Sequence, residues 1–261
     1  MRVARTIPAL RLALSPGRVG LVPTMGSFHE GHLSLMQAAR AECNVVVVSL
    51  FVNPAQFAPN DDLERYPHDE ESDVRLAEEA GVDVLFIPSA EVMYPKGFGT
   101  WVEVEDTGGE GAARPDHFRG VATVCLKLFN IVRPDVAFFG QKDAQQTEVI
   151  RRMVRDLELK VHLRVLPTVR DENGLALSSR NAYLSDEERQ RALALPHALE
   201  AGRSAHAAGS DPIAATRAAL NGLDPDYVEL IDLEAVTVLA AAVQIGPTRL
   251  LDNVVLEGDL R

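Results

Sequence analysis

The sequence predicts an α/β protein: a Rossmann-like parallel sheet with helices on both faces, followed by a small α+β C-terminal domain. Over about the first two thirds of the chain, apolar β-branched segments alternate with segments of helical periodicity, as in a parallel sheet. After Arg170 this alternation stops, and turn signals become frequent. We therefore expect a larger domain at residues 1–171 and a smaller one at residues 172–261.

The strands of the larger domain are predicted from apolar runs that end at turn residues. Residues 44–52 are rich in valine and apolar on both faces, which is typical of a central parallel strand. The run at residues 82–87 is stopped by Pro88. Shorter apolar runs predict strands at residues 19–22, 135–139 and 160–166.

The helices between these strands are predicted from apolar residues spaced three or four apart. One helix starts near Leu33, and another over residues 69–80 is closed by Gly81. A third covers residues 120–132, and a fourth covers residues 143–157.

The C-terminal domain is predicted from turn and capping signals. Asn173 with Gly174 is a strong hairpin-turn signal, and Ser185 with Glu188 forms a capping box for a helix from Asp186. Pro196 should kink or end that helix. A helix at residues 211–220 and strands at residues 227–231 and 249–256 complete the domain.

Composition and charge limit the class of protein. The chain has 261 residues, of which 46% are hydrophobic, so a sizeable core can form without cross-links. Its formal net charge of -12 argues against a nucleic-acid partner, and an anionic ligand would need a local group of cations and N–H donors. The two cysteines, Cys43 and Cys125, suit a reducing compartment. Because we find no membrane-spanning run and no convincing signal peptide, we expect a cytoplasmic protein.

The segment at residues 21–35 joins a predicted strand end to a predicted helix start. It places His29, Gly31 and His32 at the helix N-terminus, where unpaired N–H groups and the helix dipole favour an anion such as phosphate. Gly31 permits close approach, and the two imidazoles offer donors to phosphate oxygens. A zinc pair and two structural surface histidines are the alternatives, although no third zinc ligand follows at the usual spacing.

Two later segments also place polar side chains at predicted strand ends. Asn53 and Gln56 are neutral amides that can bind hydroxyl and carboxylate groups, or they can be simple turn residues. Lys142 offers a positive charge to a phosphate oxygen, and Asp143 can cap the next helix or bind a ribose hydroxyl.

Two loops add further candidates for anion binding. Residues 114–121 form a basic, glycine-preceded loop that is either a mobile lid over a phosphate site or an ordinary loop. Ser178, Ser179 and Arg180 lie at the predicted domain junction, where two hydroxyls and a guanidinium match the acceptors of a polyphosphate.

These motifs together resemble the pantothenate synthetase (pantoate–β-alanine ligase) family of the nucleotidylyltransferase-like superfamily. His29-Glu-Gly-His32 matches the superfamily's His-x-Gly-His signature, and Phe-Gly-Gln-Lys-Asp-Ala-Gln-Gln at residues 139–146 matches a later family motif. Leu-Ser-Ser-Arg-Asn at residues 177–181 matches another, with Leu177 in place of the usual Met. Residues 61–67 also match, but His68 follows where the family commonly has Arg.

The resemblance implies that the chain is a ligase of pantothenate biosynthesis, in the coenzyme A pathway. It implies ATP-dependent condensation of (R)-pantoate with β-alanine through a pantoyl adenylate, releasing AMP and pyrophosphate. It also implies Mg²⁺ as a cofactor and a homodimer. The residues implied to bind ATP in the Rossmann-like domain and at its junction are Met25, Gly26, His29, Gly31, His32, Gly140, Gln141, Lys142, Asp143, Val169, Leu177, Ser178, Ser179 and Arg180.

The resemblance further implies that Gln56 and Gln146 bind pantoate and that Asp73 contacts magnesium, although a solvated helix face explains Asp73 equally well. Because the chemistry shifts negative charge among phosphate oxygens, catalysis should rest on positioning and charge stabilisation. The catalytic set that we expect, with His32 as first choice, is His32, His29, Lys142, Ser178, Ser179 and Arg180.

Two other functions share the first motif. A nucleotidylyltransferase would leave the AMP group on a phosphorylated acceptor, whereas the paired amides Gln56 and Gln146 favour a small hydroxy acid. A non-enzymatic ATP-sensing module would need no second substrate site. The products formed from ATP, pantoate and β-alanine distinguish the three.

Overall fold

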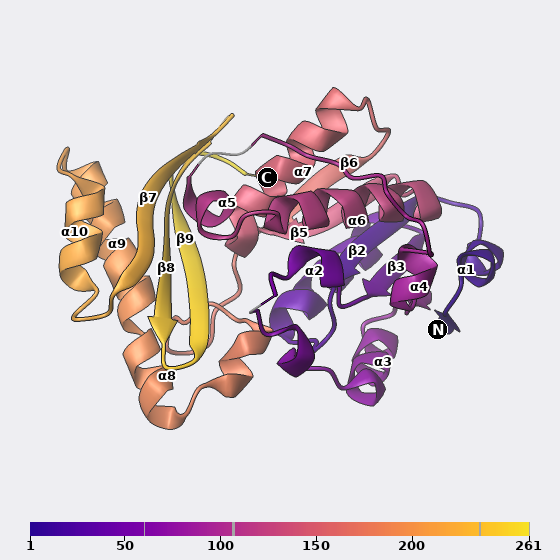
Figure 1. Cartoon of the computed structure of the whole chain (residues 1–261), viewed down its shortest axis with the longest axis horizontal. Helices are drawn as coiled ribbons and strands as arrows, with labels where there is room; N and C mark the ends of the chain where they lie inside the picture. Colours follow the sequence, from indigo (N-terminus) through magenta and orange to yellow (C-terminus); the bar gives the residue numbers. More distant parts are fainter. Residues whose placement is uncertain (60, 106–107, 235, 261) are drawn as a thin grey trace.

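The structure is a computed structural model that describes residues 1–59, 61–105, 108–234 and 236–260. Its strands form a six-stranded parallel sheet and a separate three-stranded antiparallel sheet (Figure 1). The parallel sheet contains β1 (Arg2–Ala4), β2 (Val19–Thr24), β3 (Val45–Leu50), β4 (Val84–Phe86), β5 (Val136–Gly140) and β6 (His162–Leu166). The antiparallel sheet contains β7 (Pro225–Leu233), β8 (Val236–Ile245) and β9 (Thr248–Gly258).

The order of the parallel strands is β1-β4-β3-β2-β5-β6, and all neighbours run in the same direction. The chain therefore proceeds outward from β2 through β3 to β4, then crosses back to β5 on the other side of β2. This reversal makes a topological switch point between β2 and β5, the place where open α/β sheets bind ligands.

Both faces of the parallel sheet are covered by helices, because alternate side chains of each strand point to opposite faces. Val45 and Val47 of β3 belong to one buried cluster, whereas Val46 and Val48 belong to the other. The first face is covered by α1 (Ile7–Ala13), α6 (His117–Val132) and α7 (Ala144–Asp156), and the second by α2 (Glu30–Glu42) and α3 (Glu70–Glu79).

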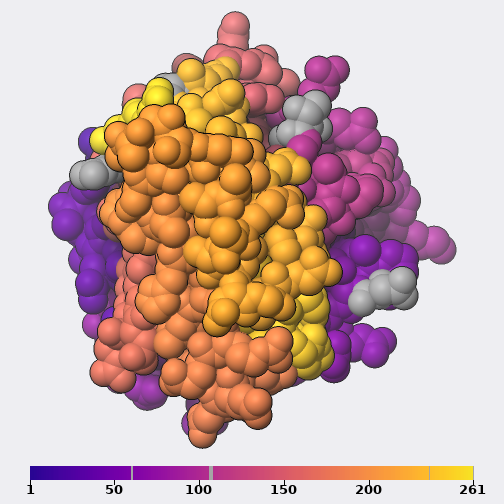
Figure 2. Space-filling view, turned by 90° about the vertical axis from the view of Figure 1, so that its left-hand side faces the viewer, coloured from indigo at the N-terminus to yellow at the C-terminus, as the bar shows by residue number. Residues whose placement is uncertain are grey.

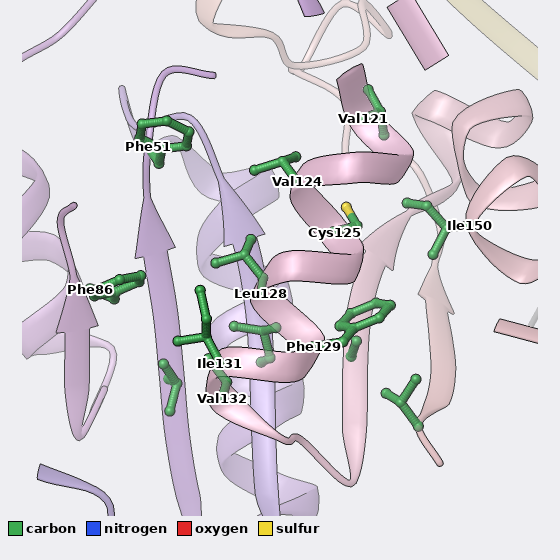
Figure 3. Close-up of a cluster of buried hydrophobic side chains, with 14 of the residues drawn as sticks. Phe51, Phe86, Val121, Val124, Cys125, Leu128, Phe129, Ile131, Val132 and Ile150 are labelled. Atoms are coloured by element: carbon green, nitrogen blue, oxygen red, sulfur yellow. The ribbon is translucent and has the colours of Figure 1, made fainter. Parts of the chain in front are cut away.

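The apolar face of α6 supplies much of the larger cluster. Figure 3 shows Val124, Cys125, Leu128 and Phe129 on successive turns, directed toward the strands. Cys125 is buried, and burial raises the pKa of its thiol to about 12. The apolar residues of α6 that recur three or four positions apart in the sequence therefore form the contact between this helix and the sheet.

The antiparallel sheet has helices on its outer face and the larger domain on its inner face (Figures 1 and 2). The outer helices are α8 (Asp186–Ala192), α9 (Ala194–Ala207) and α10 (Pro212–Ala219). On the inner side, Tyr227 and Val238 share a buried cluster with Ala144 and Val165 of the larger domain. The remaining short elements are η1 (Pro54–Gln56), η2 (Leu63–Arg65), α4 (Ala90–Met93), α5 (Gly109–Ala113), η3 (Gln141–Asp143) and η4 (Ser179–Tyr183).

The predicted fold class is confirmed, and the strands and helices expected before residue 170 are all present with shifted ends. As expected, the helix from Asp186 does not continue through Pro196: it ends at Ala192, and Pro196 lies in the first turn of a new helix, α9, where its missing N–H is not needed. The sequence analysis did not identify β1, α1 or β8. The division at residue 171 stays a prediction.

Gly120 should be required for the close contact between α6 and η1. A Cβ at this position would lie 2.3 Å from the carbonyl oxygen of Ala55 and 2.7 Å from Cα of Gln56, so backbone would have to move. Gly120→Ala should therefore lower the free energy of unfolding by about 1–3 kcal/mol, despite the better helix propensity of alanine. Denaturant titration measures the change. Gly99→Ala, with only one distant neighbour near its Cβ, should stay within about ±0.5 kcal/mol; equal effects would contradict the argument.

Candidate active site

A cavity lies beyond the carboxyl ends of β2, β3 and β5, and residues of β7, β8 and β9 line its other side. Most of the residues that the sequence analysis selected line it. They are Met25, His29, Gly31, His32, Gln56, Gly140, Lys142, Asp143, Gln146, Val169, Leu177, Ser178, Ser179 and Arg180. Gly26, Gln141 and Asp73 are not part of the lining. Segments spread over residues 25–180 thus meet at the switch point.

The two histidines cap the first turn of α2 through their Nδ1 atoms. His29 Nδ1 accepts a hydrogen bond from the Gly31 N–H at 3.1 Å, and His32 Nδ1 accepts one from the His29 N–H at 3.4 Å. A ring nitrogen that accepts a hydrogen bond cannot carry the proton of a neutral imidazole, so the proton lies on Nε2 in both rings. Both histidines can therefore donate one Nε2–H to a ligand.

Both imidazoles are held in the neutral form. Burial, followed by the positive charge of Lys142, lowers the pKa of His29 to about 4. Burial, followed by His29 and Lys142, lowers the pKa of His32 to about 3. The rings lie 4.2 Å apart between centroids, so two positive charges there would repel each other. At pH 7 the pair consists of uncharged donors.

The loop before His29 is held by Asp73. Gly26 and Ser27 have positive φ angles of 88° and 53°, so the chain turns sharply here. The buried carboxylate of Asp73 accepts hydrogen bonds from the N–H groups of Ser27 and Phe28, at 2.8 and 2.7 Å. Burial raises the pKa of Asp73, against the effect of these two donors. Because both oxygens serve the loop, the residue is poorly suited to hold a metal; its role as a magnesium ligand stays a prediction.

The amide of Gln56 has a fixed orientation. Tyr94 donates its hydroxyl hydrogen to Asn53 Oδ1 at 2.8 Å, and Asn53 Nδ2 donates to Gln56 Oε1 at 3.0 Å. Gln56 Nε2 therefore faces away from Asn53, and it contacts the weak acceptor Met25 Sδ at 3.2 Å. Gln56 thus presents N–H donors to the cavity, and a ligand oxygen is the better acceptor for them.

The arginines at the cavity are paired with carboxylates. Arg180 makes two hydrogen bonds of 2.9 Å to the carboxylate of Asp62, which is the bidentate geometry. Arg114 donates to Asp61 at 2.6 Å and to the backbone carbonyl of Gln56 at 3.2 Å. The basic loop thus supports the backbone of Gln56. Lys142 has a looser partner, since its Nζ lies 4.0 Å from Asp143 Oδ1.

An ion pair between Glu110 and Arg249 connects the antiparallel sheet to the wall of the cavity. Glu110 of α5 is 6% exposed, and it accepts a hydrogen bond from Arg249 of β9 at 2.8 Å. Burial opposes ionisation, but the hydrogen bond and charge of Arg249 outweigh it and hold the pKa of Glu110 below its usual value. This ion pair joins residues 139 positions apart, so it ties the C-terminal sheet to the loop ahead of α6.

Several lining residues were not selected from the sequence. Tyr94 supports the site from behind it, while Thr168, Tyr227, Asp252 and Asn253 line it from the side of the antiparallel sheet. The polar pair Asp252-Asn253 interrupts the apolar residues at positions 250–256 of β9, and that interruption was the available signal. Among the described residues, no group of three His, Cys, Asp or Glu side chains is arranged to hold a metal ion.

Comparison with known proteins gives one consistent family. Residues 2–255 match the family model of pantoate-beta-alanine ligase. The pantothenate synthetase of Acidobacterium capsulatum is 48% identical over 98% of this chain and 97% of its own length. That of Roseiflexus castenholzii is 51% identical over 98% of this chain and 100% of its own length.

Solved structures agree with these matches. The crystal structure of pantothenate synthetase from Thermus thermophilus superimposes with a TM-score of 0.95 at 46% identity, covering 98% of this chain and 100% of that one. The pantoate-beta-alanine ligase of Francisella tularensis, complexed with beta-gamma ATP and β-alanine, gives a TM-score of 0.86 at 34% identity, covering 98% of both chains.

The lowered histidine pKa values predict a pH-dependent stability. In the unfolded chain each imidazole binds a proton with a pKa near 6.5, whereas in the folded protein His29 and His32 bind one only at pH about 4 and about 3. The free energy of unfolding therefore falls as the pH drops from about 6.5 to about 3. His32→Gln removes one such group. The melting temperature of the variant should therefore fall less than that of the parent between pH 6.5 and pH 4. Exposed His162→Gln is the control, and parallel curves for all three proteins would contradict the prediction.

Proposed function

The chain belongs to the pantoate–β-alanine ligase family, and we infer that it joins pantoate to β-alanine at the expense of ATP. Relatives named pantothenate synthetase match it over almost their whole length at about half identical residues. The observation that carries the inference is that one cavity is lined by three groups of residues. They are the N-terminus of α2 with His29 and His32, the loop with Lys142, and the amides of Gln56 and Gln146. A phosphorylated acceptor, as in the nucleotidylyltransferase alternative, would need more cations than the paired arginines leave.

The reaction needs an activated acid. A carboxylate does not react usefully with an amine, because oxide is a poor leaving group, whereas AMP is a good one. We propose that the pantoate carboxylate attacks the α-phosphate of ATP, releasing pyrophosphate and forming pantoyl adenylate. The amine of β-alanine then adds to the acyl carbon and displaces AMP. No side chain becomes covalently attached, so the protein acts by positioning and by stabilising charge.

We assign the phosphates to the N-terminus of α2. His29 and His32 each direct one Nε2–H into the cavity, as their Nδ1 atoms are occupied by backbone donors. Lys142 supplies the positive charge, and Ser178, Ser179 and Arg180 line the same cavity from η4 and the residue before it. His32 is the proposed catalytic residue. A neutral imidazole can hold a phosphate oxygen through the transition state without giving up its proton.

We assign pantoate to the two glutamines. Gln56 offers donors because Asn53 occupies its Oε1, so it suits the oxygen of a hydroxyl or carboxylate. Gln146 lies on the first turns of α7 and lines the same cavity. Neutral amides bind an anionic substrate without adding charge beside the reacting carboxylate.

The cofactor, assembly and location complete the proposal. No group of three His, Cys, Asp or Glu side chains is found among the described residues, so we propose that Mg²⁺ is held mainly by triphosphate oxygens and water, for which few protein ligands are needed. We propose a homodimer in the cytoplasm, which the family resemblance favours; the two buried free thiols suit a reducing compartment. No helix in the described part of the chain is long and apolar enough to span a membrane.

The experiment that tests the function is product analysis by mass spectrometry. ATP, pantoate and β-alanine should give pantothenate with equal amounts of AMP and pyrophosphate. With β-alanine omitted, pyrophosphate should still exchange into ATP. His32→Ala should slow this exchange about 10²–10³-fold, the usual cost of one preorganised donor. An adenylylated acceptor would favour the alternative transferase, and exchange that requires β-alanine would argue against a free adenylate.

Tyr94 should affect the binding of pantoate indirectly, through Asn53 and Gln56. Tyr94→Phe removes the shortest of the hydrogen bonds that orient Asn53, leaving the weaker ones to Ala55 N–H and Gly120 O, so Gln56 is held less firmly. The KM for pantoate should rise about five-fold, the equivalent of one hydrogen bond, while the KM for ATP changes less than about two-fold. Steady-state kinetics with each substrate varied measures both. Trp101→Phe is the control, because it alters the ring stacked on Tyr94 and leaves the hydroxyl in place. Equal changes for both substrates would count against the assignment.

A further inference from the structure

We propose that Asn253, on the middle of β9, is a positioning residue that fixes the ATP-binding loop at Gln141 and Lys142 from the C-terminal sheet. The proposal rests on the function inferred above, and it gives the C-terminal sheet a role in binding one particular substrate. Asn253 does not belong to any motif that pointed to the function.

The contact is made by both hydrogens of one amide group. Asn253 Nδ2 donates to the carbonyl oxygen of Gln141 at 3.0 Å and to that of Lys142 at 2.8 Å. The side chain is 2% exposed. An NH₂ group has two hydrogens, so its donor capacity is filled and the amide cannot flip without losing both bonds. Asn253 Oδ1 is consequently turned away from the loop, and it has no protein partner among the described residues.

The loop needs an external anchor. Strand pairing between β5 and β6 ends at Gly140 and Leu166, so the backbone leaves the sheet just before Gln141. Gly140 has no heavy atom within 4 Å of where its Cβ would be, so nothing packs against that position. Asn253 holds the two carbonyl groups that follow. It thereby sets the direction from which Lys142 enters the cavity.

The neighbouring residue anchors the other side of the strand. Asp252 is 1% exposed, and its carboxylate accepts two hydrogen bonds from Arg170, at 2.6 and 3.1 Å. It also accepts the backbone N–H of Asn253 at 2.8 Å. Arg170 lies at the junction between the two sheets and binds the carbonyl of Gly174 as well. Asp252 therefore keeps the backbone of Asn253 in place, so its amide is presented to the loop by a fixed strand.

Packing of the antiparallel sheet against the rest of the protein does not by itself require the buried polar residues Asp252 and Asn253. An apolar cluster that includes Ala144, Val165, Tyr227 and Val238 already joins them. Burying an amide and a carboxylate in such an interface is costly, and the cost is higher here because Asn253 Oδ1 has no protein partner among the described residues. An apolar residue would pack there at less cost. The directional contact to the loop is the property that asparagine adds and an aliphatic residue lacks.

The test compares three variants of the full chain. Asn253→Ala removes both hydrogen bonds, and Asn253→Asp keeps the shape but replaces the donor by an oxygen that faces two carbonyl oxygens. Leu250→Val perturbs the core of the same strand and leaves the loop untouched, so it reports on general weakening of the domain. For each, ATP affinity is measured by calorimetry, the KM values for ATP and pantoate by kinetics, and folding by melting curves.

Both Asn253 variants should bind ATP about 25-fold more weakly, the equivalent of two net hydrogen bonds, while the KM for pantoate stays within about two-fold. Leu250→Val should lower the melting temperature and leave ATP affinity unchanged. Unchanged ATP affinity in folded Asn253→Ala would overturn the proposal, as would the same loss in Leu250→Val.

A result that refutes the proposed function can be distinguished from one that refutes the role of Asn253. A parent protein that binds ATP but makes no pantothenate would refute the function, while calorimetry would still test the role of Asn253.

Discussion

The site depends on one feature of the chain path: β2 and β5 lie side by side, but the helices that follow them pack on opposite faces of the sheet. Helix α2 contributes to the cluster with Val46 and Val48, whereas α7 contributes to the cluster with Val45 and Val47. The two connecting loops must therefore diverge, and a crevice remains between them. His29 and His32 lie at the end of the first connection, at the N-terminus of α2, and Lys142 lies in the second, so the topology brings them together.

Within this crevice, directed donors matter more than net charge. The chain carries a formal charge of -12, and the arginines at the cavity are already paired with Asp61, Asp62 and Glu110. These carboxylates reduce the positive potential, but they hold each guanidinium in one geometry, which lowers the entropy lost when a ligand binds. The neutral imidazoles add N–H groups that need no counterion. Such a site selects an anion by the direction of its oxygens, with Lys142 as the loosely paired cation.

The sequence predicted what is encoded locally. The helix start at His29, the valine-rich β3 and the lysine loop after β5 each depend on neighbours within a few residues, and all were identified. Strand β8 was missed because it contains Ala240, Ala241 and Ala242, which have low strand propensity and are buried by segments far from them in the sequence. The strand propensity of a segment contains no information about a neighbouring strand that lies far away in the sequence.

The same reason explains which parts of the site were missed. Gln56 is recognisable from its segment, but its orientation depends on Tyr94, which lies 38 positions further along the chain and contacts it only through Asn53. Asn253 lies more than a hundred positions from the loop that it holds. Supporting residues of this kind belong to no motif, so only the folded backbone reveals them. They also carry much of the precision that positioning catalysis requires.

The antiparallel sheet has a second consequence for the chemistry. A mixed anhydride between an acid and AMP is readily hydrolysed, so the cavity must exclude water while it awaits the amine. Val238, Ala240 and Leu251 line the cavity from this sheet and offer no group that could bind or activate water. The polar contacts of the same sheet, through Arg249 and Asn253, are directed at the loops of the larger domain. The antiparallel sheet thus contributes apolar side chains to the cavity wall, beside Tyr227, Asp252 and Asn253, together with hydrogen bonds that hold the facing loops in place.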